Sequence, residues 1–252
     1  MEHLKARHAV VTGGGSGIGA SIAVALAQAG ALVTIAGRRA GPLEELAASN
    51  ERIEAVTCDV TDEASVAALF EQANGRAQVD IVIANAGIAE SNPFDRTPLE
   101  QWQRIMDINL TGVFLTLREG YRCMKGRDYG RLLAISSIAG VRGYGYVAPY
   151  CASKHGVVGL VRALAQETAG KGITANAICP GYAETPMLTR SVDNIRSKTG
   201  MSEEDARKSL SIHNPAGHFI QPEEVAAAAL WLCGDDARSV TGQTITISGG
   251  DP

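Results

Sequence analysis

Short apolar runs alternate with helical stretches along the whole chain, and this alternation limits the fold more than any other feature of the sequence. Seven runs are predicted strands, and several are apolar at consecutive positions, as strands covered on both faces are. Apolar residues recur at helical spacing after the first run, and helical stretches also follow the next two, at Ile18/Ile22/Leu26, Leu43–Ala48 and Glu63–Ala73. The predicted strands are Val10-Val11, Val33–Ala36, Val56-Thr57, Ile81–Ala84, Leu132–Ile135, Thr174–Ile178 and Thr244–Ile247.

Seven strands with helical segments between them predict an α/β fold, a doubly wound parallel sheet with helices on both faces. The chain has 252 residues, 45% of them hydrophobic, which is enough for one large domain. No linker-like composition or internal repeat divides residues 1–252, so we expect a single domain. Residues 184–219 form a long polar insertion after a strand, and we predict that this insertion is a lid over a site.

The charge and the cysteines exclude several classes of function. A formal charge of −4 argues against nucleic acid or an anionic membrane as partner. The polar start of the chain has no secretory signal, and the longest nearly apolar stretch, residues 23–36, is too short to span a bilayer. We expect a cytoplasmic protein without a metal site, because five cysteines lie scattered without metal-ligand spacing: Cys58, Cys123, Cys151, Cys179 and Cys233.

A glycine-rich segment, TGGGSGIGAS at residues 12–21, directly follows the first predicted strand. Glycines there permit a tight turn and a close approach to a pyrophosphate, which the N-terminus of the next helix favours. Two registers fit a dinucleotide site: Gly15-x-Gly17-x-x-Ala20, or Gly13-x-x-x-Gly17-x-Gly19. The alternative is an ordinary glycine turn.

The second predicted strand ends in Arg38 and Arg39, where an NAD-binding chain would carry a carboxylate for the ribose 2′-hydroxyl. Two guanidinium groups suit a phosphate instead. The sequence therefore favours NADP(H), with NAD(H) as the alternative cofactor, unless the two arginines are only a solvated pair.

One Tyr–Lys pair in the stretch SSIAGVRGYGYVAPYCASK, residues 136–154, has helical spacing: Tyr150 and Lys154 lie one turn apart. An adjacent ammonium, together with an oxidised nicotinamide, would lower the pKa of the phenol and suit it to proton transfer. Ser137 ends a strand and could polarise the same carbonyl oxygen, whereas Ser136 would point to the opposite face. The loop tyrosines Tyr144 and Tyr146 either line a substrate pocket or belong to a plain loop.

These motifs, in this order, resemble the short-chain dehydrogenase/reductase family over nearly the full chain, with its Rossmann-type fold. The resemblance favours the Gly13/Gly17/Gly19 register. It extends to Cys58-Asp59-Val60, Asn85-Ala86-Gly87, Asn109, Ser137, Tyr150-x-x-x-Lys154, and Pro180-Gly181 with Thr185. Ala84 departs from the family pattern, which has a second Asn there.

The resemblance implies a role for each matching residue. The catalytic residues would be Asn109, Ser137, Tyr150 and Lys154, with Asn109 holding a water that links Lys154 to solvent. Substrate would meet Ser137, Tyr144, Tyr146, Tyr150, Tyr182 and Met187. The cofactor would meet Thr12, Gly13, Ser16, Gly17, Ile18, Gly19, Arg38, Arg39, Asp59, Val60, Asn85, Ala86, Gly87, Tyr150, Lys154, Pro180, Gly181, Ala183 and Thr185.

Within the family the chain looks most like 3-ketoacyl-thioester reductases and 3-hydroxyacyl-CoA dehydrogenases, with polyketide ketoreductases similar in the same places. The segments that carry this likeness are residues 148–160, 176–186 and 221–225. Two other functions stay open: an alcohol, polyol or sugar dehydrogenase, and a non-catalytic dinucleotide sensor. Four cations either meet an anionic phosphopantetheine arm or are solvated: Arg142, Arg190, Arg196 and Lys198.

The helix that carries Tyr150 also presents small residues that would allow close approach of a second helix, namely Ala148, Ala152, Gly156 and Gly159. In the family such helices pair in dimers and tetramers, so the resemblance implies a homotetramer.

Overall fold

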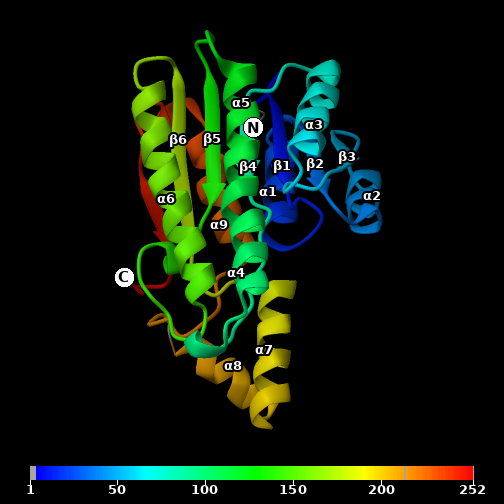
Figure 1. The fold of residues 1–252 in the computed structure, drawn as a ribbon. Helices are drawn as coiled ribbons and strands as arrows, with labels where there is room; N and C mark the ends of the chain where they lie inside the picture. The colour runs from blue at the N-terminus through cyan, green and yellow to red at the C-terminus, as the bar shows by residue number, and fades with distance from the viewer. Residues whose placement is uncertain (1–3, 213, 252) are drawn as a thin grey trace.

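The computed structural model describes residues 4–212 and 214–251. Within them all seven predicted strands form one parallel sheet in the order β3-β2-β1-β4-β5-β6-β7 (Figure 1). The strands are β1 (His8–Thr12), β2 (Leu32–Gly37), β3 (Ile53–Thr57), β4 (Ile81–Ala84), β5 (Gly130–Ile135), β6 (Ile173–Pro180) and β7 (Thr244–Ile247). The predicted doubly wound α/β fold is therefore confirmed.

Helices cover both faces of the sheet because the strand side chains alternate between two hydrophobic clusters. Val11 packs into one cluster and its neighbour Val10 into the other. The first cluster takes its helical residues from α1 (Gly17–Gln28), α2 (Ala40–Ala48) and α9 (Pro222–Cys233). The second takes them from α3 (Glu63–Arg76), α5 (Gly112–Met124) and α6 (Ala148–Thr168).

The strand order fixes where a ligand site can lie. β1 pairs with both β2 and β4, so the chain reverses its direction of winding between β1 and β4. Thr12 at the end of β1 is in register with Ala36 on β2 and Ala84 on β4. The segments that leave the carboxyl ends of these strands therefore meet at a topological switch point, where α/β sheets bind their ligands.

The lid segment, residues 184–219, is more regular than its polar sequence suggested. It contains α7 (Pro186–Thr199) and α8 (Glu203–Ser211), which extend beyond the end of the sheet toward which the strands point (Figure 1). Leu188 and Val192 of α7 and Ala206 of α8 form the centre of a small separate hydrophobic cluster between these helices. The two ends of the segment are tied together, since Glu184 N–H donates to the carbonyl of Ile220 (2.9 Å).

Only some of the small residues of α6 that were predicted to allow close approach of a second helix are open to one. A Cβ at Gly156 would lie 2.8 Å from Leu110, so this glycine is used for packing within the chain. Gly159 has no atom within 4 Å of the same position and is exposed. Within the described residues, no helix is both long and apolar enough to span a bilayer.

Candidate active site

The glycine turn is held against the neighbouring strand by Asn85. Its Nδ2 donates to the carbonyls of Thr12 (3.0 Å) and Gly13 (3.1 Å), and the Thr12 hydroxyl accepts from the Asn85 N–H (3.2 Å) and the Ala86 N–H (3.4 Å). A Cβ at Gly19 would lie 2.4 Å from the Gly13 carbonyl oxygen, so only glycine fits there. The structure thus uses the Gly13/Gly17/Gly19 register, with Gly17 in the left-handed region at φ +54°.

The first turn of α1 is suited to an anion. Its N-cap residue, Ser16, makes no side-chain capping bond, and the first turn contains no acidic residue that would repel a phosphate. The N–H groups of Gly17, Ile18 and Gly19 lack intrahelical acceptors, and the helix dipole places partial positive charge there. The Ser16 hydroxyl and these N–H groups fit the pyrophosphate of a dinucleotide.

Arg38 and Arg39 follow β2 at the same edge of the sheet, and both side chains are exposed. Neither forms an ion pair with any residue of the described ranges 4–212 and 214–251. Asp59 follows the next strand, where Thr61 binds its carboxylate through the N–H (3.0 Å) and the hydroxyl (2.8 Å). These bonds lower the pKa of Asp59, with a smaller contribution from the charge of Arg38. Val60 beside it is buried against Gly112.

Ser137, not Ser136, faces Tyr150. The Ser136 hydroxyl donates to the Lys154 carbonyl (3.0 Å) and so attaches the end of β5 to the backbone of α6. The Ser137 hydroxyl contacts the Pro180 carbonyl (3.5 Å), accepts from the Ala139 N–H (3.1 Å), and forms a hydrogen bond with the Tyr150 side chain that lowers the phenol pKa. The alternation of strand side chains therefore separates the two serines as predicted.

Burial nevertheless dominates the acidity of Tyr150. It raises the pKa of the phenol to about 12, and the hydrogen bond from Ser137 offsets only part of this effect. In the protein without cofactor the pKa of Tyr150 is therefore raised, and the lowering expected with an oxidised nicotinamide bound stays a prediction. The reason is desolvation: burial raises the free energy of the phenolate by more than the hydrogen bond from the neighbouring hydroxyl lowers it.

Lys154 lies beside Tyr150, with Nζ 5.7 Å from the centre of the tyrosine ring. The side chain is buried, and this burial lowers the pKa of the amine to about 8. Among the described residues Nζ donates one hydrogen bond, to the carbonyl of Ile135 (2.8 Å). An ammonium carries three N–H donors, so the remaining donors suit the hydroxyl groups of a ribose.

Asn109 lies in a π-helical turn, Asp107–Thr111, between α4 (Leu99–Met106) and α5. Its Oδ1 accepts from the Ile88 N–H (2.8 Å), and its Nδ2 donates to the Ile88 carbonyl (2.9 Å) and the Ser153 hydroxyl (3.2 Å). A Cβ at Gly87 would lie 3.3 Å from Asn109 Oδ1 and 3.6 Å from Lys154 Nζ, so both side chains flank this glycine. The side chain of Asn109 fixes the loop after β4, and the implied water relay stays a prediction.

Of the predicted substrate tyrosines, two meet beside Tyr150. The rings of Tyr144 and Tyr182 pack edge to face, with centroids 6.5 Å apart, and Tyr182 lies near enough to Tyr150 to help raise the phenol pKa. Tyr146 is 71% exposed, and its carbonyl accepts a hydrogen bond from Asn92 N–H (2.8 Å). The ring pair therefore packs beside Tyr150, whereas contact of the exposed Tyr146 ring with substrate stays a prediction. Met187 is half-buried in the first turn of α7.

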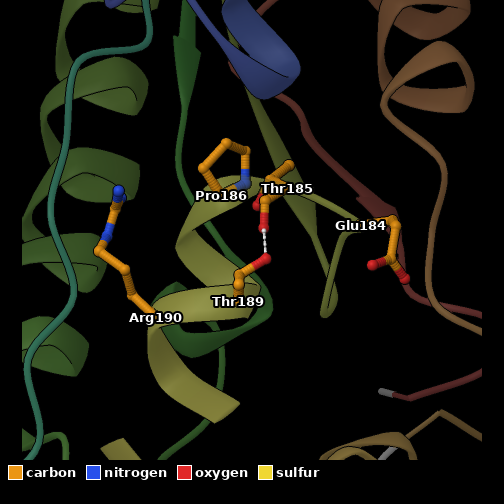
Figure 2. Close-up of a pocket in the computed structure, with 5 residues that line it drawn as sticks. All are labelled: Glu184, Thr185, Pro186, Thr189 and Arg190. Carbon is orange, nitrogen blue, oxygen red and sulfur yellow. Dashed lines mark hydrogen bonds between the residues drawn. The ribbon is translucent and has the colours of Figure 1, made fainter. Parts of the chain in front are cut away.

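A pocket of about 480 Å³ opens where α7 begins, lined by Glu184, Thr185, Pro186, Thr189 and Arg190 (Figure 2). Thr185 brings this pocket to the glycine turn, because a Cβ at Gly17 would lie 3.1 Å from its side chain. The loop that leads to it leaves β6 through Pro180 and Gly181, whose N–H donates to the carbonyl of Ile247 (2.9 Å). Ala183 is buried, and the pocket joins the cofactor edge to the lid segment.

The four cations considered for an anionic substrate arm differ in their surroundings. Arg196 pairs with Asp193 (3.5 Å), and Lys198 Nζ donates to the Ser91 carbonyl (3.1 Å). Arg142 pairs with the buried Asp251. In Figure 2 Arg190 extends away from Glu184, and within the described residues it has no ion pair.

Two residues near the site were not among those predicted from the sequence. Asp251 carries a carboxylate that is 4% exposed, and Ser153 holds Asn109 in place. Asp251 follows Gly249 and Gly250, two glycines with positive φ, and this pair was the available signal for a chain reversal toward the site.

The geometry agrees with comparisons to known proteins. A family model described as enoyl-(acyl carrier protein) reductase matches residues 13–251. Acetoacetyl-CoA reductase of Rhizobium meliloti (strain 1021) is 39% identical over 247 residues, covering 97% of this chain and 98% of that protein. D-beta-hydroxybutyrate dehydrogenase of the same organism is 34% identical over 252 residues, covering 96% and 97%.

A solved structure matches equally well. Actinorhodin polyketide ketoreductase with NADPH superposes with a TM-score of 0.94 at 35% identity, covering 98% of this chain and 97% of that one. The matched family model, the full-length relatives and the Tyr150–Lys154 geometry agree with one another. The chain belongs to the short-chain dehydrogenase/reductase family of NAD(P)-dependent oxidoreductases.

Proposed function

We propose that this protein reduces the ketone of a 3-ketoacyl thioester to a secondary alcohol, with NADPH as the hydride donor. The observation that carries the proposal is the grouping of Ser137, Tyr150 and Lys154 at the carboxyl edge of the sheet, beside a helix N-terminus suited to a pyrophosphate. Ketone reduction needs a hydride, a proton and a polarised carbonyl. This edge of the sheet offers a site for the cofactor that carries the hydride. It also carries residues that can donate the proton and polarise the carbonyl.

The bound nicotinamide supplies the hydride, and the side chains manage the proton and the charge. Ser137 donates a hydrogen bond to the carbonyl oxygen and so stabilises negative charge as it develops. Tyr150 donates its proton to the same oxygen, a step for which the neutral phenol favoured by burial is the correct form. Lys154 holds the ribose of the cofactor and, when protonated, favours the phenolate left behind.

The substrate class is supported by what surrounds the tetrad of Asn109, Ser137, Tyr150 and Lys154. The Tyr144–Tyr182 ring pair offers an apolar wall beside the phenol, which suits an acyl chain. Two similar proteins support the same class, because their names, acetoacetyl-CoA reductase and polyketide ketoreductase, describe reduction of such ketones. Arg190, at the mouth of the pocket, is the cation we assign to the anionic arm of a thioester substrate.

Three further properties belong to the same proposal. Arg38 and Arg39 bind the 2′-phosphate, so NADPH is preferred over NADH. The chain assembles as a homotetramer through the exposed face of α6. It works in the cytoplasm, since its free thiols suit a reducing compartment.

The decisive experiment follows NADPH oxidation with acetoacetyl-CoA and with a panel of sugars and simple secondary alcohols and ketones. Turnover of acetoacetyl-CoA at a far higher kcat/KM than the panel is expected. Turnover confined to a sugar or a simple alcohol would instead identify a polyol or alcohol dehydrogenase. Tight cofactor binding without turnover of any carbonyl would identify a dinucleotide sensor.

Tyr150→Phe tests the proton step in the same assay. Removing the hydroxyl is expected to lower kcat by about 10²- to 10⁴-fold, the usual contribution of a general acid, while the Kd for NADPH stays near the wild-type value. Tyr121→Phe is the matched control, because Tyr121 lies on α5 and its hydroxyl contacts only Lys171 (3.5 Å) among the described residues. Full activity in Tyr150→Phe would remove Tyr150 from the proton path.

A further inference from the structure

We infer that Asp251 is a positioning residue that sets the wall of the substrate pocket by holding the loop before α6, residues 141–147. This inference rests on the proposed function of the site, because it assigns a specificity role for the same ketone. Asp251 lies far from Tyr144 along the chain, and its carboxylate makes the contact that joins the segment after β7 to this loop.

The segment after β7 is shaped to bring Asp251 inward. Gly249 and Gly250 have φ of +62° and +100°, and a Cβ at Gly249 would lie only 1.9 Å from Asn214 Oδ1. The turn is closed by the Ser248 hydroxyl, which donates to the Asp251 carbonyl (2.5 Å). Both the backbone angles and the close approach to Asn214 require glycine at position 249, so the reversal toward the loop is specified by sequence.

The carboxylate of Asp251 is 4% exposed, and a buried charge is tolerated only when it is paired and hydrogen-bonded. Arg142 donates from its guanidinium to Oδ1, and the Tyr144 hydroxyl donates to Oδ2. The Arg142 guanidinium also lies 5.1 Å from the centre of the Tyr144 ring. We call these three side chains the Asp251 anchor. It fixes the loop at two residues and orients one aromatic ring.

Backbone hydrogen bonds hold both ends of the loop: the N–H groups of Val141 and Arg142 donate to the Ile138 carbonyl (3.0 Å each), and the Val147 carbonyl accepts from the Cys151 N–H (2.9 Å). The middle of the loop is more exposed. A Cβ at Gly143 or at Gly145 would meet nothing within 4 Å, and Tyr146, at φ +67°, has an exposed ring. The backbone contact of Tyr146 is the hydrogen bond from Asn92 to its carbonyl (2.8 Å). A segment with exposed backbone opens readily unless side chains hold it, so the Asp251 anchor restrains the middle of the loop.

The position of the loop affects the substrate site because the loop leads directly into α6, the helix that carries Tyr150. Tyr144 packs edge to face on Tyr182 (6.5 Å between centroids), and Tyr182 lies close to Tyr150. A looser Tyr144 would therefore shift the ring pair of Tyr144 and Tyr182. We expect this pair to determine which face of the ketone is turned toward the hydride donor. The anchor therefore acts on substrate binding and on product stereochemistry.

The test compares Asp251→Asn with wild type. The amide keeps the size of the side chain but has no charge and one acceptor oxygen, so it cannot hold the guanidinium and the hydroxyl equally well. We expect the KM for acetoacetyl-CoA to rise about tenfold, with a smaller change in kcat and an unchanged Kd for NADPH. The ratio of the two 3-hydroxy enantiomers is expected to fall toward one.

Tyr144→Phe removes a single hydroxyl and keeps the ring, so it tests the same contact if Asp251→Asn folds poorly. It is expected to raise KM in the same direction by a smaller factor. Both substitutions weaken the hydrogen bond between Tyr144 and Asp251, so their effects on KM should be less than additive in the double variant. Fully additive effects of the two substitutions would overturn the inference. Asp236→Asn, at an exposed acid outside the site, is the control and should match wild type.

Hydrogen exchange separates this inference from the proposed function, because it needs no substrate. In Asp251→Asn without cofactor, amides of residues 141–147 should exchange at least about fivefold faster than in wild type and in Asp236→Asn. Unchanged exchange there would overturn the anchor, whatever the enzyme reduces. Absence of turnover in the wild-type protein would refute the proposed function, while the exchange result would still decide whether Asp251 holds the loop.

Discussion

Burial of Lys154 gives the stability of the protein a specific dependence on pH. The amine has a pKa of about 8 in the fold and 10.5 as its ordinary value, so between these values the unfolded chain binds more protons. The free energy of unfolding contributed by this group therefore rises with pH from about 8 to 10.5. Below pH 8 the buried ammonium destabilises the fold by an amount on the order of 3 kcal/mol.

Lys154→Met removes this titration, and unfolding in urea without cofactor at pH 7, 8.5 and 10 measures the effect. The variant loses the hydrogen bond to Ile135, so either protein could be the more stable at pH 7. The expected result is that the difference in unfolding free energy shifts in favour of wild type as the pH rises. Lys125→Met, at an exposed lysine, is the control for loss of a lysine side chain elsewhere in the fold. A constant difference for Lys154→Met would contradict the buried, shifted amine.

Arg38→Asp tests the choice of cofactor at a single residue. The substitution replaces an exposed guanidinium with a carboxylate, which repels a 2′-phosphate and accepts from a 2′-hydroxyl. We expect the ratio of kcat/KM for NADPH to that for NADH to fall by about a hundredfold or more. Arg96→Asp, at a residue whose side chain is 78% exposed outside the site, is the control. An unchanged ratio would show that Arg38 does not read the phosphate.

Sequence spacing was sufficient to choose Ser137 over Ser136 and to pair Tyr150 with Lys154, since both depend on the fixed periods of strands and helices. It could not give the pKa of Tyr150, because desolvation depends on every element packed around the phenol. It also could not separate Tyr144 from Tyr146, two residues apart in one loop. Their difference comes from Asp251, which only the folded chain brings near.

The glycine turn and α1 act together as one element. Gly19→Ala places a methyl group 2.4 Å from the carbonyl oxygen of Gly13, and backbone cannot yield to it as a flexible side chain would. The turn must open, so we expect both lower stability and at least a tenfold weaker binding of NADPH, measured by fluorescence titration. Gly75→Ala, in α3 with nothing within 4 Å, should instead stabilise by up to about 1 kcal/mol. Wild-type cofactor affinity in Gly19→Ala would contradict this account of the turn.

Elements differed in how readily the sequence revealed them. The strands were predictable because both faces are buried, which leaves consecutive apolar residues such as Ile81–Ala84. The helix α7 was not predicted because its apolar residues are few and lie in a polar segment. Leu188, Val192 and Ile195 have helical spacing, but they pack in a small separate cluster and not in the main core. The π-helical turn at Asp107–Thr111 has no periodic signal, since its extra residue depends on the contacts of Asn109.

At the scale of the whole molecule, the proposed assembly through α6 would connect the site to a partner copy. One side of this helix carries Tyr150 and Lys154, and another leaves Ala148, Ala152 and Gly159 accessible beside α4 and α5. Those two helices expose Leu99 (74%), Trp102 (37%) and Phe114 (42%), apolar side chains that a partner copy would cover. A symmetric pairing across this face would hold the catalytic helix rigidly from outside.

Gly159→Arg tests this assembly. The glycine is exposed and its Cβ position is open in the single chain, so the substitution is tolerated by the fold but fills a helix–helix contact between copies. Light scattering after size exclusion should give four times the 26.4 kDa chain for wild type and two chains for the variant, because a tetramer with twofold symmetry that loses one type of interface falls to dimers. Gly75→Arg, on the exposed side of α3, should remain tetrameric. A wild-type mass other than four chains would refute the tetramer, and a tetrameric Gly159→Arg would place the interface elsewhere than on α6.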